Sequence, residues 1–465
     1  MTDPGTAPVA SVVPVTRELG RWVARLHASD LPDAVLTHLK TCVLDAIGCG
    51  LYGAQQPWSC IAAEMAIESS GGRGVSLLGR PEIVSPAEAA LVNGTAIHGY
   101  EIDDVHVSSS LHPASVTVPA ALAAIESRGG TGGDLLVALA AGYECGIRTG
   151  ICAGTTHSTS GFHVTGTAGP IAAAAAVAKV LKLDDERTMH AIAIGATQAS
   201  GLYAARMGAM AKRFRAGRAS QSGVIAALLA EKEFTGSPIA IEAPFGGFMS
   251  TLSGQFAAET MLEDLGQRWE TVRVGFKVYS ACASAHTTVD AVLGMMQQGL
   301  TADNLQSLVI WMTKKGHLNV GWPYAPGEVV SAQMNGCFTA AVTLLDGEAF
   351  INQYQPSRLA DPAILALVER IQIRHDPELD KAGAEKRHAV RAEATLQDGS
   401  IFKIEVQHRL GSAERPVSPQ DIERKFRQLT ETLLPPPAVN ELIGLVGDLE
   451  HQNNLDRIVD LLSGR

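Results

Sequence analysis

Alanine-rich segments with helical spacing dominate the first half of the chain and limit the folds that it can adopt. Four of them lack the β-branched richness of buried strands and cover residues 119–127, 134–147, 169–181 and 219–234. Apolar residues recur at helical spacing in 17–26 and 34–51 as well. Because alanine and glycine let helices approach closely, we expect residues 15–265 to form a tightly packed helical domain.

The second half of the chain alternates between strand-like and helical segments. Helical patterns cover 286–298, 337–346, 418–434 and 438–462, and Ser418 is expected to cap a helix that begins at Pro419. Asp398-Gly399 indicates a hairpin between the last two of five β-rich runs, which are 271–274, 308–311, 371–373, 389–394 and 401–406. The sequence therefore predicts a mainly α protein with an α+β part. We expect a large all-helical domain of residues 1–270, completed by 409–465, and a smaller inserted α+β lid domain of residues 271–408.

The composition is that of a globular protein with a large core. Of its 465 residues 46% are hydrophobic and 18% are charged, and the net charge of −11 argues against nucleic acid and anionic membranes as partners. The first ten residues do not resemble a secretory signal, and residues 169–181 are too short to span a bilayer. Seven scattered cysteines, an odd number, indicate reduced thiols, so we expect a cytoplasmic protein.

Acidic and histidine side chains are concentrated in residues 93–113, NGTAIHGYEIDDVHVSSSLHP. Buried charges require partners, so this density indicates a site that moves protons. The candidates in this segment are Glu101, Asp104, His106 and His112. Asp103 and Asp104 could orient and tune the imidazole of His106. The alternative is that the acids and serines before Pro113 cap the helix that follows.

Two further segments suit an anionic ligand. His163 stands in a glycine-flanked loop before a helix, where it could contact a carboxylate, although a lone histidine is more often structural. In the cluster KRFRAGR, Lys212 and Arg215 could share one helical face, and a solvated surface patch is the alternative. An anion site in a net-acidic protein needs such locally concentrated cations.

A fourth segment, FKVYSACASAH, contains Lys277 and Tyr279 at the presumed start of the smaller domain. Cys282 and His286 are spaced like metal ligands, but no second pair matches them, so a helix start that buries Cys282 is favoured. The sequence has no phosphate-binding G-x-x-x-x-G-K-[ST] loop and no G-x-S-x-G elbow. The one G-x-G-x-x-G match, residues 48–53, ends a helical pattern instead of following a strand.

Taken in order, these segments resemble the MmgE/PrpD family, whose members include 2-methylcitrate dehydratase, cis-aconitate decarboxylase and iminodisuccinate epimerase. The acidic segment is similar to the family pattern NGTAAHxLDFDDTH followed by HP. HLKTCVLDAIGCGLYGA, GFHVTGTAGPIAAAAAVAKVL, KRFRAGRASQSGVIAALLAEKEFTG, FKVYSACASAHTTVDAV and AQMNGCFTAAVTLLDG resemble other family motifs in the expected order. The resemblance spans nearly the whole chain.

The resemblance implies a cleft between a helical domain and a lid, a homodimer, no metal or organic cofactor, and proton movement beside a carboxylate of a small di- or tricarboxylic acid. Family active-site positions carry over to Glu101, His112, His163, Lys212 and Lys277, with His106 and Asp104 close by. Lys212, Arg215 and Lys277 would hold substrate carboxylates and stabilise developing negative charge. We add Tyr279 to the expected substrate-binding residues.

The chain departs from the family pattern at Glu101 (usually Asp), Val105 (Thr), Arg215 (His), Asn335 (Ser) and Phe338 (Tyr). These changes remove groups that a dehydratase could use to protonate a leaving hydroxyl, whereas an epimerase needs only a base and an acid on opposite faces. We therefore predict an isomerase, a cofactor-independent epimerase of an iminodisuccinate-like acid. The alternatives are a hydro-lyase or decarboxylase acting on a small tricarboxylate, and a non-catalytic anion-binding protein.

Overall fold

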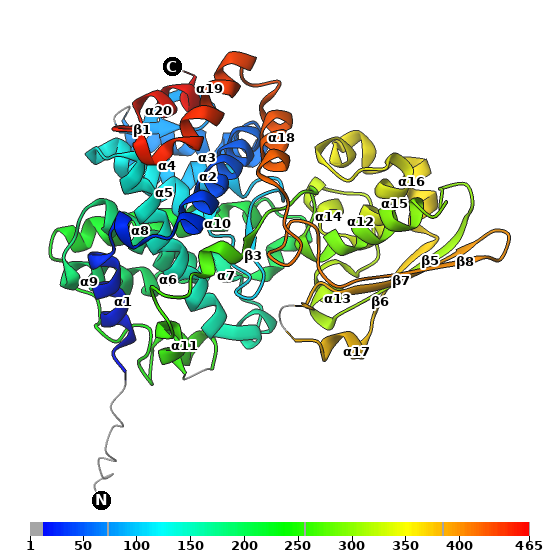
Figure 1. Ribbon diagram of the computed structural model, residues 1–465, viewed down its shortest axis with the longest axis horizontal. Coiled ribbons are helices and arrows are strands. Elements are labelled where there is room, and N and C mark those ends of the chain that lie inside the picture. Colours follow the sequence, from blue (N-terminus) through cyan, green and yellow to red (C-terminus); the bar gives the residue numbers. More distant parts are fainter. Residues whose placement is uncertain (1–12, 72–73, 255–256, 384–385, 465) are drawn as a thin grey trace, which may run out of the picture.

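The computed structural model describes residues 13–71, 74–254, 257–383 and 386–464 (Figure 1). These residues form a helical lobe, made of α1–α11 and α18–α20, beside a smaller lobe, made of α12–α17 and β5–β8. The first part of the helical lobe contains α1 (Val15–Arg25), α2 (Asp33–Ala54), α3 (Pro57–Ser70), α4 (Pro86–Ile97), α5 (Ala114–Arg128), α6 (Gly132–Thr159), α7 (Val164–Thr167), α8 (Gly169–Val180), α9 (Asp185–Thr197), α10 (Ala211–Glu231) and α11 (Phe248–Leu252). The mainly helical fold with an α+β part is confirmed.

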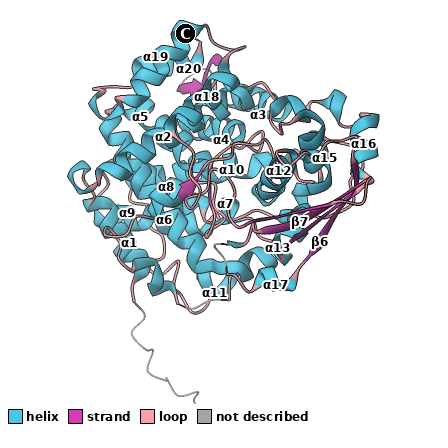
Figure 2. Ribbon diagram, turned by 45° about the vertical axis from the view of Figure 1, so that its right-hand side comes forward, coloured by secondary structure: helices cyan, strands magenta, loops and turns pink. Residues whose placement is uncertain are grey.

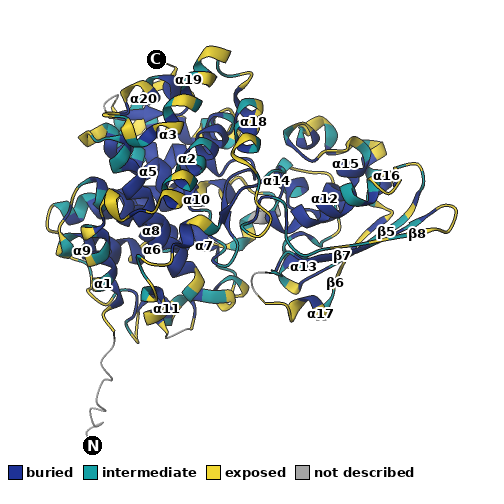
Figure 3. Ribbon diagram, in the orientation of Figure 1, coloured by how far each residue is buried: buried dark blue, intermediate teal, exposed yellow. Residues whose placement is uncertain are grey.

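Small residues let the central helices of this lobe pack closely. A Cβ atom added to Gly217 of α10 would lie 2.0 Å from the carbonyl oxygen of Leu91 in α4, so only glycine fits there. This approach sets α10, which begins with the cationic cluster, directly against the helix that leads into the acidic segment. Figure 3 shows the interior of the lobe as continuously buried.

Two short sheets interrupt the helical lobe, which is therefore not all-helical as expected. β1 (Val75–Leu77) and β2 (Arg80–Val84) form an antiparallel hairpin. β3 (Val105–His106) pairs with β4 (Val274–Gly275), which joins the acidic segment to the start of the smaller lobe. The run 271–274 was expected to be a strand but is mostly a 3₁₀ turn, and only its last residue is extended.

The smaller lobe is a four-stranded sheet covered by helices. Its strands run in the order β6-β5-β7-β8, with β5 parallel to β6 and antiparallel to β7. Figure 2 shows α12 and α15 on one face of this sheet. The elements are α12 (Ala283–Met296), β5 (Leu305–Met312), α13 (Lys314–Val320), α14 (Val329–Gln333), α15 (Gly336–Asp346), α16 (Pro362–Val368), β6 (Ile371–His375), α17 (Pro377–Asp380), β7 (Val390–Leu396) and β8 (Ile401–Val406). The predicted hairpin turn lies between β7 and β8, with Gly399 at φ +86°.

The end of the chain returns to the helical lobe. It forms α18 (Pro419–Thr430), α19 (Pro436–Gly447) and α20 (Asp456–Ser463), where a single helix over 438–462 was expected. The predicted cap is present, since the Ser418 hydroxyl accepts a hydrogen bond from the Asp421 amide. α18 packs on α2, and the two lobes have separate hydrophobic cores. The exact domain limits drawn from the sequence stay a prediction.

Two helices, α2 and α6, are long and apolar enough to cross a membrane, although the sequence analysis considered only residues 169–181. Within the fold, 61% and 89% of their most apolar windows are buried, and core helices commonly pass the same test. All seven cysteines are free thiols. The cytoplasmic location stays a prediction.

We predict that Lys425→Met destabilises the fold by about 3–5 kcal/mol, because it leaves a buried carboxylate unpaired. Lys425 of α18 forms a 2.6 Å ion pair with Asp45 of α2, and both side chains are buried. Urea unfolding followed by circular dichroism measures the loss. The matched control is Lys403→Met, which removes an exposed pair with Glu393 and should change stability by less than about 1 kcal/mol. Equal stability of the two variants would contradict this account.

Candidate active site

A pocket with about 580 Å³ of space free of protein atoms opens between the two lobes. The helical lobe and the acidic segment contribute Glu101, Val105, Val107, Ser110, His112, His163, Tyr203 and Lys212. From Lys277 onward the chain contributes Lys277, Cys282, Ala283, Ser284, Lys315, Asn319, Met334, Arg387 and His388. Five of the nine residues expected at the site therefore line one pocket: Glu101, His112, His163, Lys212 and Lys277.

Glu101 is held in the pocket by three cations. It follows the end of α4 with φ +59°, a left-handed conformation that is uncommon for a residue other than glycine. Its carboxylate contacts Lys212 and Arg213 of α10 and lies 3.3 Å from Lys277 Nζ. Burial alone would raise the pKa of Glu101, but the charges of Lys212, Lys277 and Arg213 outweigh it and hold the pKa well below its usual range. Glu101 is therefore an ionised anchor for these cations.

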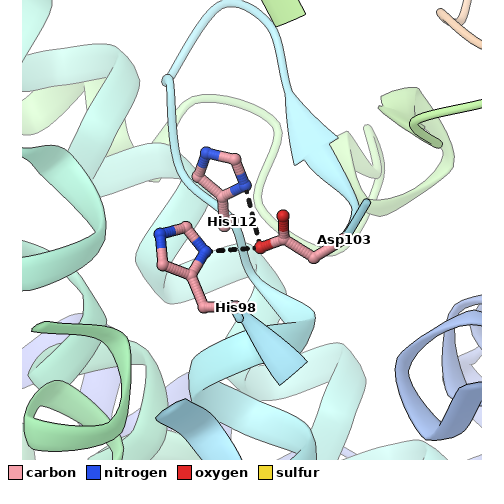
Figure 4. Close-up of side chains that lie close together, drawn as sticks. All are labelled: His98, Asp103 and His112. Carbon is pink, nitrogen blue, oxygen red and sulfur yellow. Dashed lines mark hydrogen bonds and ion pairs between the residues drawn. The ribbon is translucent and has the colours of Figure 1, made fainter. Parts of the chain in front are cut away.

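Asp103 connects two histidines to Lys277. His98 Nδ1 lies 2.6 Å and His112 Nδ1 3.1 Å from the same Asp103 oxygen (Figure 4). The other oxygen accepts a 2.9 Å hydrogen bond from Lys277 Nζ. Burial opposes ionisation of Asp103, but His112, Lys277 and His98 outweigh it, so its pKa lies well below the usual value. From the sequence, Asp103 was expected to tune His106, but in the fold it lies beside His98 and His112.

The tautomer of His112 is determined by its neighbours. Its Nδ1 lies 2.8 Å from the carbonyl oxygen of Asp104, which can only accept, so Nδ1 carries a proton. A neutral His112 therefore keeps its lone pair on Nε2. The ring lies in the pocket lining and stacks near His163, with ring centroids 6.0 Å apart.

His163 and Lys212 have complementary protonation states. Burial, followed by the charge of Arg215, lowers the pKa of His163 well below its usual value, so this imidazole is neutral near pH 7. Burial also lowers the pKa of Lys212, to about 8, while Glu101 limits the shift. Lys212 is thus protonated at neutral pH yet close to releasing its proton. A neutral base and an acid of moderate strength face one pocket.

Two of the expected catalytic residues, Asp104 and His106, do not line the pocket. The Asp104 carboxyl accepts hydrogen bonds from the Ala114 amide, at 3.1 Å, and from the Tyr143 hydroxyl, also at 3.1 Å. Burial and the neighbouring Asp103 raise its pKa well above the usual value. This is the capping role that the sequence left open as an alternative.

His106 belongs to β3 and holds the loop that follows it. Its Nδ1 lies 3.0 Å from the Ser109 hydroxyl, and its Nε2 lies 3.4 Å from Glu270. The hydrogen bond with His106 is the main reason that the pKa of Glu270 falls to about 2. His106 is therefore placed to shape the loop and not to contact a ligand.

Arg215 and Tyr279 also differ from their expected positions. Arg215 is buried, and its guanidinium donates to the carbonyl oxygens of Leu202 and Lys212 instead of lining the pocket. The Tyr279 hydroxyl donates a 2.9 Å hydrogen bond to Asp290 within the smaller lobe. Neither side chain lines the pocket, although the charge of Arg215 acts on His163.

The structure adds pocket cations that the sequence analysis did not find. Lys315 of α13 and Arg387, which precedes β7, line the pocket from the smaller lobe. Arg213 does not line the pocket but contacts the Glu101 carboxylate. In the sequence, Lys315 and Arg387 stand in short charged runs, KK and EKR, of the kind usually found on surfaces. No local signal separates them from exposed residues.

Among the described residues, one group has the composition of a metal site: His98, Asp103 and His112, with ligand atoms within 4.8 Å of one another. His98 Nδ1 donates to Asp103, the protonated His112 Nδ1 lies 3.1 Å from the same carboxylate, and the Lys277 ammonium lies beside it. Because a cation there would have to displace two protons next to a lysine, these contacts favour a hydrogen-bonded network over a metal centre. The expectation that no cofactor is needed stays a prediction.

Two of the sequence departures behind the epimerase prediction lie away from the pocket. Phe338 is fully buried in the core of the smaller lobe. Asn335 caps α15, where its side-chain oxygen accepts from the Phe338 amide at 2.9 Å. A lost hydroxyl at these positions therefore says nothing about the group that protonates a substrate.

Several relatives of the chain are lyases by name. A cis-aconitate decarboxylase-like protein of Aspergillus oryzae is 31% identical over 97% of both chains. A cis-aconitate decarboxylase of Aspergillus terreus is 28% identical over 97% of this chain and 96% of its own. A 2-methylcitrate dehydratase of Escherichia coli is 26% identical over 80% of this chain and 81% of its own. These relatives contradict the prediction of an isomerase, and the epimerase reading has no support among them.

Two sequence models of one family match consecutive parts of the chain. The MmgE/PrpD N-terminal domain matches residues 17–261, and the MmgE/PrpD C-terminal domain matches residues 279–450. The pocket described above lies between these two parts. The chain belongs to the MmgE/PrpD family.

Proposed function

We propose that this protein is a lyase that removes CO₂ from a small unsaturated tricarboxylate of the cis-aconitate type. The observation that carries the proposal is the charge of the pocket lining. Among the described lining residues, Lys212, Lys277, Lys315 and Arg387 are basic, and Glu101 alone is acidic. In a protein of net charge −11, such a lining suits a compact polyanion.

The proposed chemistry follows from the structure of such a substrate. In a β,γ-unsaturated acid, the bond from carbon to the carboxylate breaks and CO₂ leaves. The electron pair moves into the allylic system, so the double bond shifts and negative charge develops beside another carboxylate. A proton then adds at that carbon. Ammonium groups already in place, such as that of Lys277, would stabilise the developing charge.

Lys212 is the proposed proton donor. It is protonated at neutral pH, whereas the neighbouring His163 is neutral and has no proton in excess. Glu101 holds the Lys212 ammonium in the pocket. Asp103 fixes the ring of His112 so that Nε2 can accept a hydrogen bond from a protonated group or water.

A hydro-lyase of the 2-methylcitrate type is the second candidate, because a neutral His163 beside a protonated Lys212 also provides the base and the acid that loss of water requires. Decarboxylation is preferred because relatives with that name match 97% of the chain, against about 80% for the dehydratases. The homodimer implied by the family stays part of the proposal.

We expect proton NMR in D₂O to show that the protein converts cis-aconitate to a product with one carbon fewer. The product should contain a terminal alkene and one deuteron from solvent, because the double bond shifts and protonation follows loss of CO₂. Released CO₂ is measured in parallel. Dehydration of 2-methylcitrate with cis-aconitate left unchanged would overturn the proposal in favour of the hydro-lyase.

Lys212→Ala should lower kcat by about 10²–10⁴-fold, the range typical of a lost general acid. Lys232→Ala is the matched control, because Lys232 is exposed at the other end of α10. Initial rates at saturating cis-aconitate measure both variants, and circular dichroism checks that each is folded. A Lys212→Ala enzyme within tenfold of the wild type would remove Lys212 from the mechanism.

The kcat should be constant with rising pH up to about 8 and should fall above that limit. The Lys212 proton is present below its pKa of about 8 and is lost above it, and bound carboxylates can only move the limit upward. Lys212→Arg should be slower but should lose this alkaline fall, because a guanidinium stays protonated. A kcat that rises through pH 8 would show that Lys212 acts as a base.

A further inference from the structure

The smaller lobe places a second pair of cations in the pocket, apart from the cluster around Glu101. Lys315 lies in the first turn of α13, and Arg387 lies just before β7. The Thr313 hydroxyl, which caps α13, also donates a 2.6 Å hydrogen bond to the Arg387 carbonyl oxygen. This bond joins the two cation-bearing segments, so their side chains are positioned together.

Both cations reach across the pocket to hydroxyl groups of the helical lobe. Lys315 Nζ donates to Ser110 Oγ at 3.0 Å and to Ser158 Oγ at 3.1 Å. The Arg387 guanidinium also contacts Ser110 Oγ and donates a 2.7 Å hydrogen bond to the Ser108 carbonyl oxygen. Ser110 has φ +64°, so the loop takes an unfavourable conformation at the residue that both cations share.

The two halves of the pocket differ in charge balance. Around Glu101, the cations Lys212, Arg213 and Lys277 face the carboxylates of Glu101 and Asp103. Lys315 forms no ion pair among the described residues, and its hydrogen-bond partners are neutral. Burial first, and then the charge of Arg387, lowers the pKa of Lys315 to about 7. The Lys315 ammonium is thus buried without an ion pair among the described residues.

We propose that Lys315 and Arg387, together with Ser110, bind the substrate carboxylate that is remote from the reacting carbon and so select tricarboxylates over dicarboxylates. This inference rests on the proposed function, since it names the part of the same pocket that recognises the third carboxylate. The cluster at Glu101 handles the reacting end. The hydroxyl of Ser110 can turn to donate to the same carboxylate.

The alternative is that Lys315 and Arg387 only hold the two lobes together, as a latch. This role does not account for the cost of burying a charged side chain in the pocket. The hydroxyl partners Ser110 and Ser158 offset only part of the cost of burying the Lys315 ammonium next to Arg387. A bound carboxylate would supply the missing counter-charge and accept charge-assisted hydrogen bonds from both side chains. The latch remains a defined outcome of the test below.

The test measures binding directly, by calorimetry at fixed pH and ionic strength, so that it does not depend on turnover. The probes are tricarballylate, a saturated tricarboxylate, and the two dicarboxylates obtained by removing one of its carboxylates, glutarate and methylsuccinate. We expect the wild type to bind tricarballylate most tightly. Lys315→Met and Arg387→Met should each weaken tricarballylate binding by about 10–100-fold, and weaken the tighter-binding dicarboxylate by less than about threefold.

Matched variants separate recognition from folding. Lys314→Met is the control, because Lys314 is the exposed neighbour of Lys315 in α13 and should bind all three acids as the wild type does. Lys315→Arg keeps the positive charge and should retain most of the preference for tricarballylate over the two dicarboxylates. Thermal unfolding of each variant identifies any loss that comes from misfolding.

Three outcomes would overturn the inference. The wild type could show no preference for tricarballylate, or the Lys315→Met and Arg387→Met variants could bind all three acids more weakly by the same factor. The variants could also bind the acids as the wild type does but unfold at a lower temperature, which would mark a latch. Failure of the proposed function gives a different result. The wild type would then leave cis-aconitate unchanged while the preference for tricarballylate, and its loss in Lys315→Met, would persist.

Discussion

The buried ammonium of Lys277 bridges Glu101 and Asp103, and the rest of the site depends on this contact. Lys277 Nζ lies 2.9 Å from Asp103 and 3.3 Å from Glu101, and all three side chains are buried. Each of the three has further or shared partners, so removing one member would leave the remaining buried charges only partly compensated. Because Lys277 stands where the chain passes into the smaller lobe, the same contact that neutralises the acidic segment also holds one lobe against the other.

The carboxylates of Glu101 and Asp103 set the charge and the orientation of the neighbouring lysine and histidine side chains. Glu101 keeps Lys212 charged and in place, while Asp103 orients His98 and His112 through one shared oxygen. His163 stands next to this network without a carboxylate of its own, and Arg215 lowers its proton affinity further. Glu101 thus maintains Lys212 as a charged acid, while burial, followed by the charge of Arg215, maintains His163 as a neutral base in the same pocket. This division allows a pocket built of strong charges to perform proton transfer near neutral pH.

Helices and strands were predicted well where the hydrophobic periodicity was strong. The prediction failed where contacts with distant parts of the chain determine the local structure. Strands β5–β8 occupy nearly the expected residues, and the alanine-rich runs are helical, although α6 continues to Thr159 and α10 begins at Ala211. The run before Val274 is a 3₁₀ turn, and only its end pairs with β3. At the site, Asp104 and His106 were grouped with the catalytic residues because they stand in the same segment rich in acids and histidines and close to the family's active-site positions. In the fold, however, Asp104 accepts from the first amide of α5, and His106, in strand β3, faces Glu270.

The sequence by itself determined the fold class, the family and the segments that supply the central acids, histidines and lysines, because periodicity and ordered motifs are local properties of a chain. Only the tertiary structure decided which of these side chains meet. Lys315 reaches Ser110 across 205 positions of sequence, and Lys277 reaches Asp103 across 174. Such pairings arise from the way two separately packed lobes close on one another, and no spacing within a single segment encodes them. For the same reason, the reaction class could not be taken from single replacements such as Phe338, whose distance from the pocket is visible only once the chain is folded.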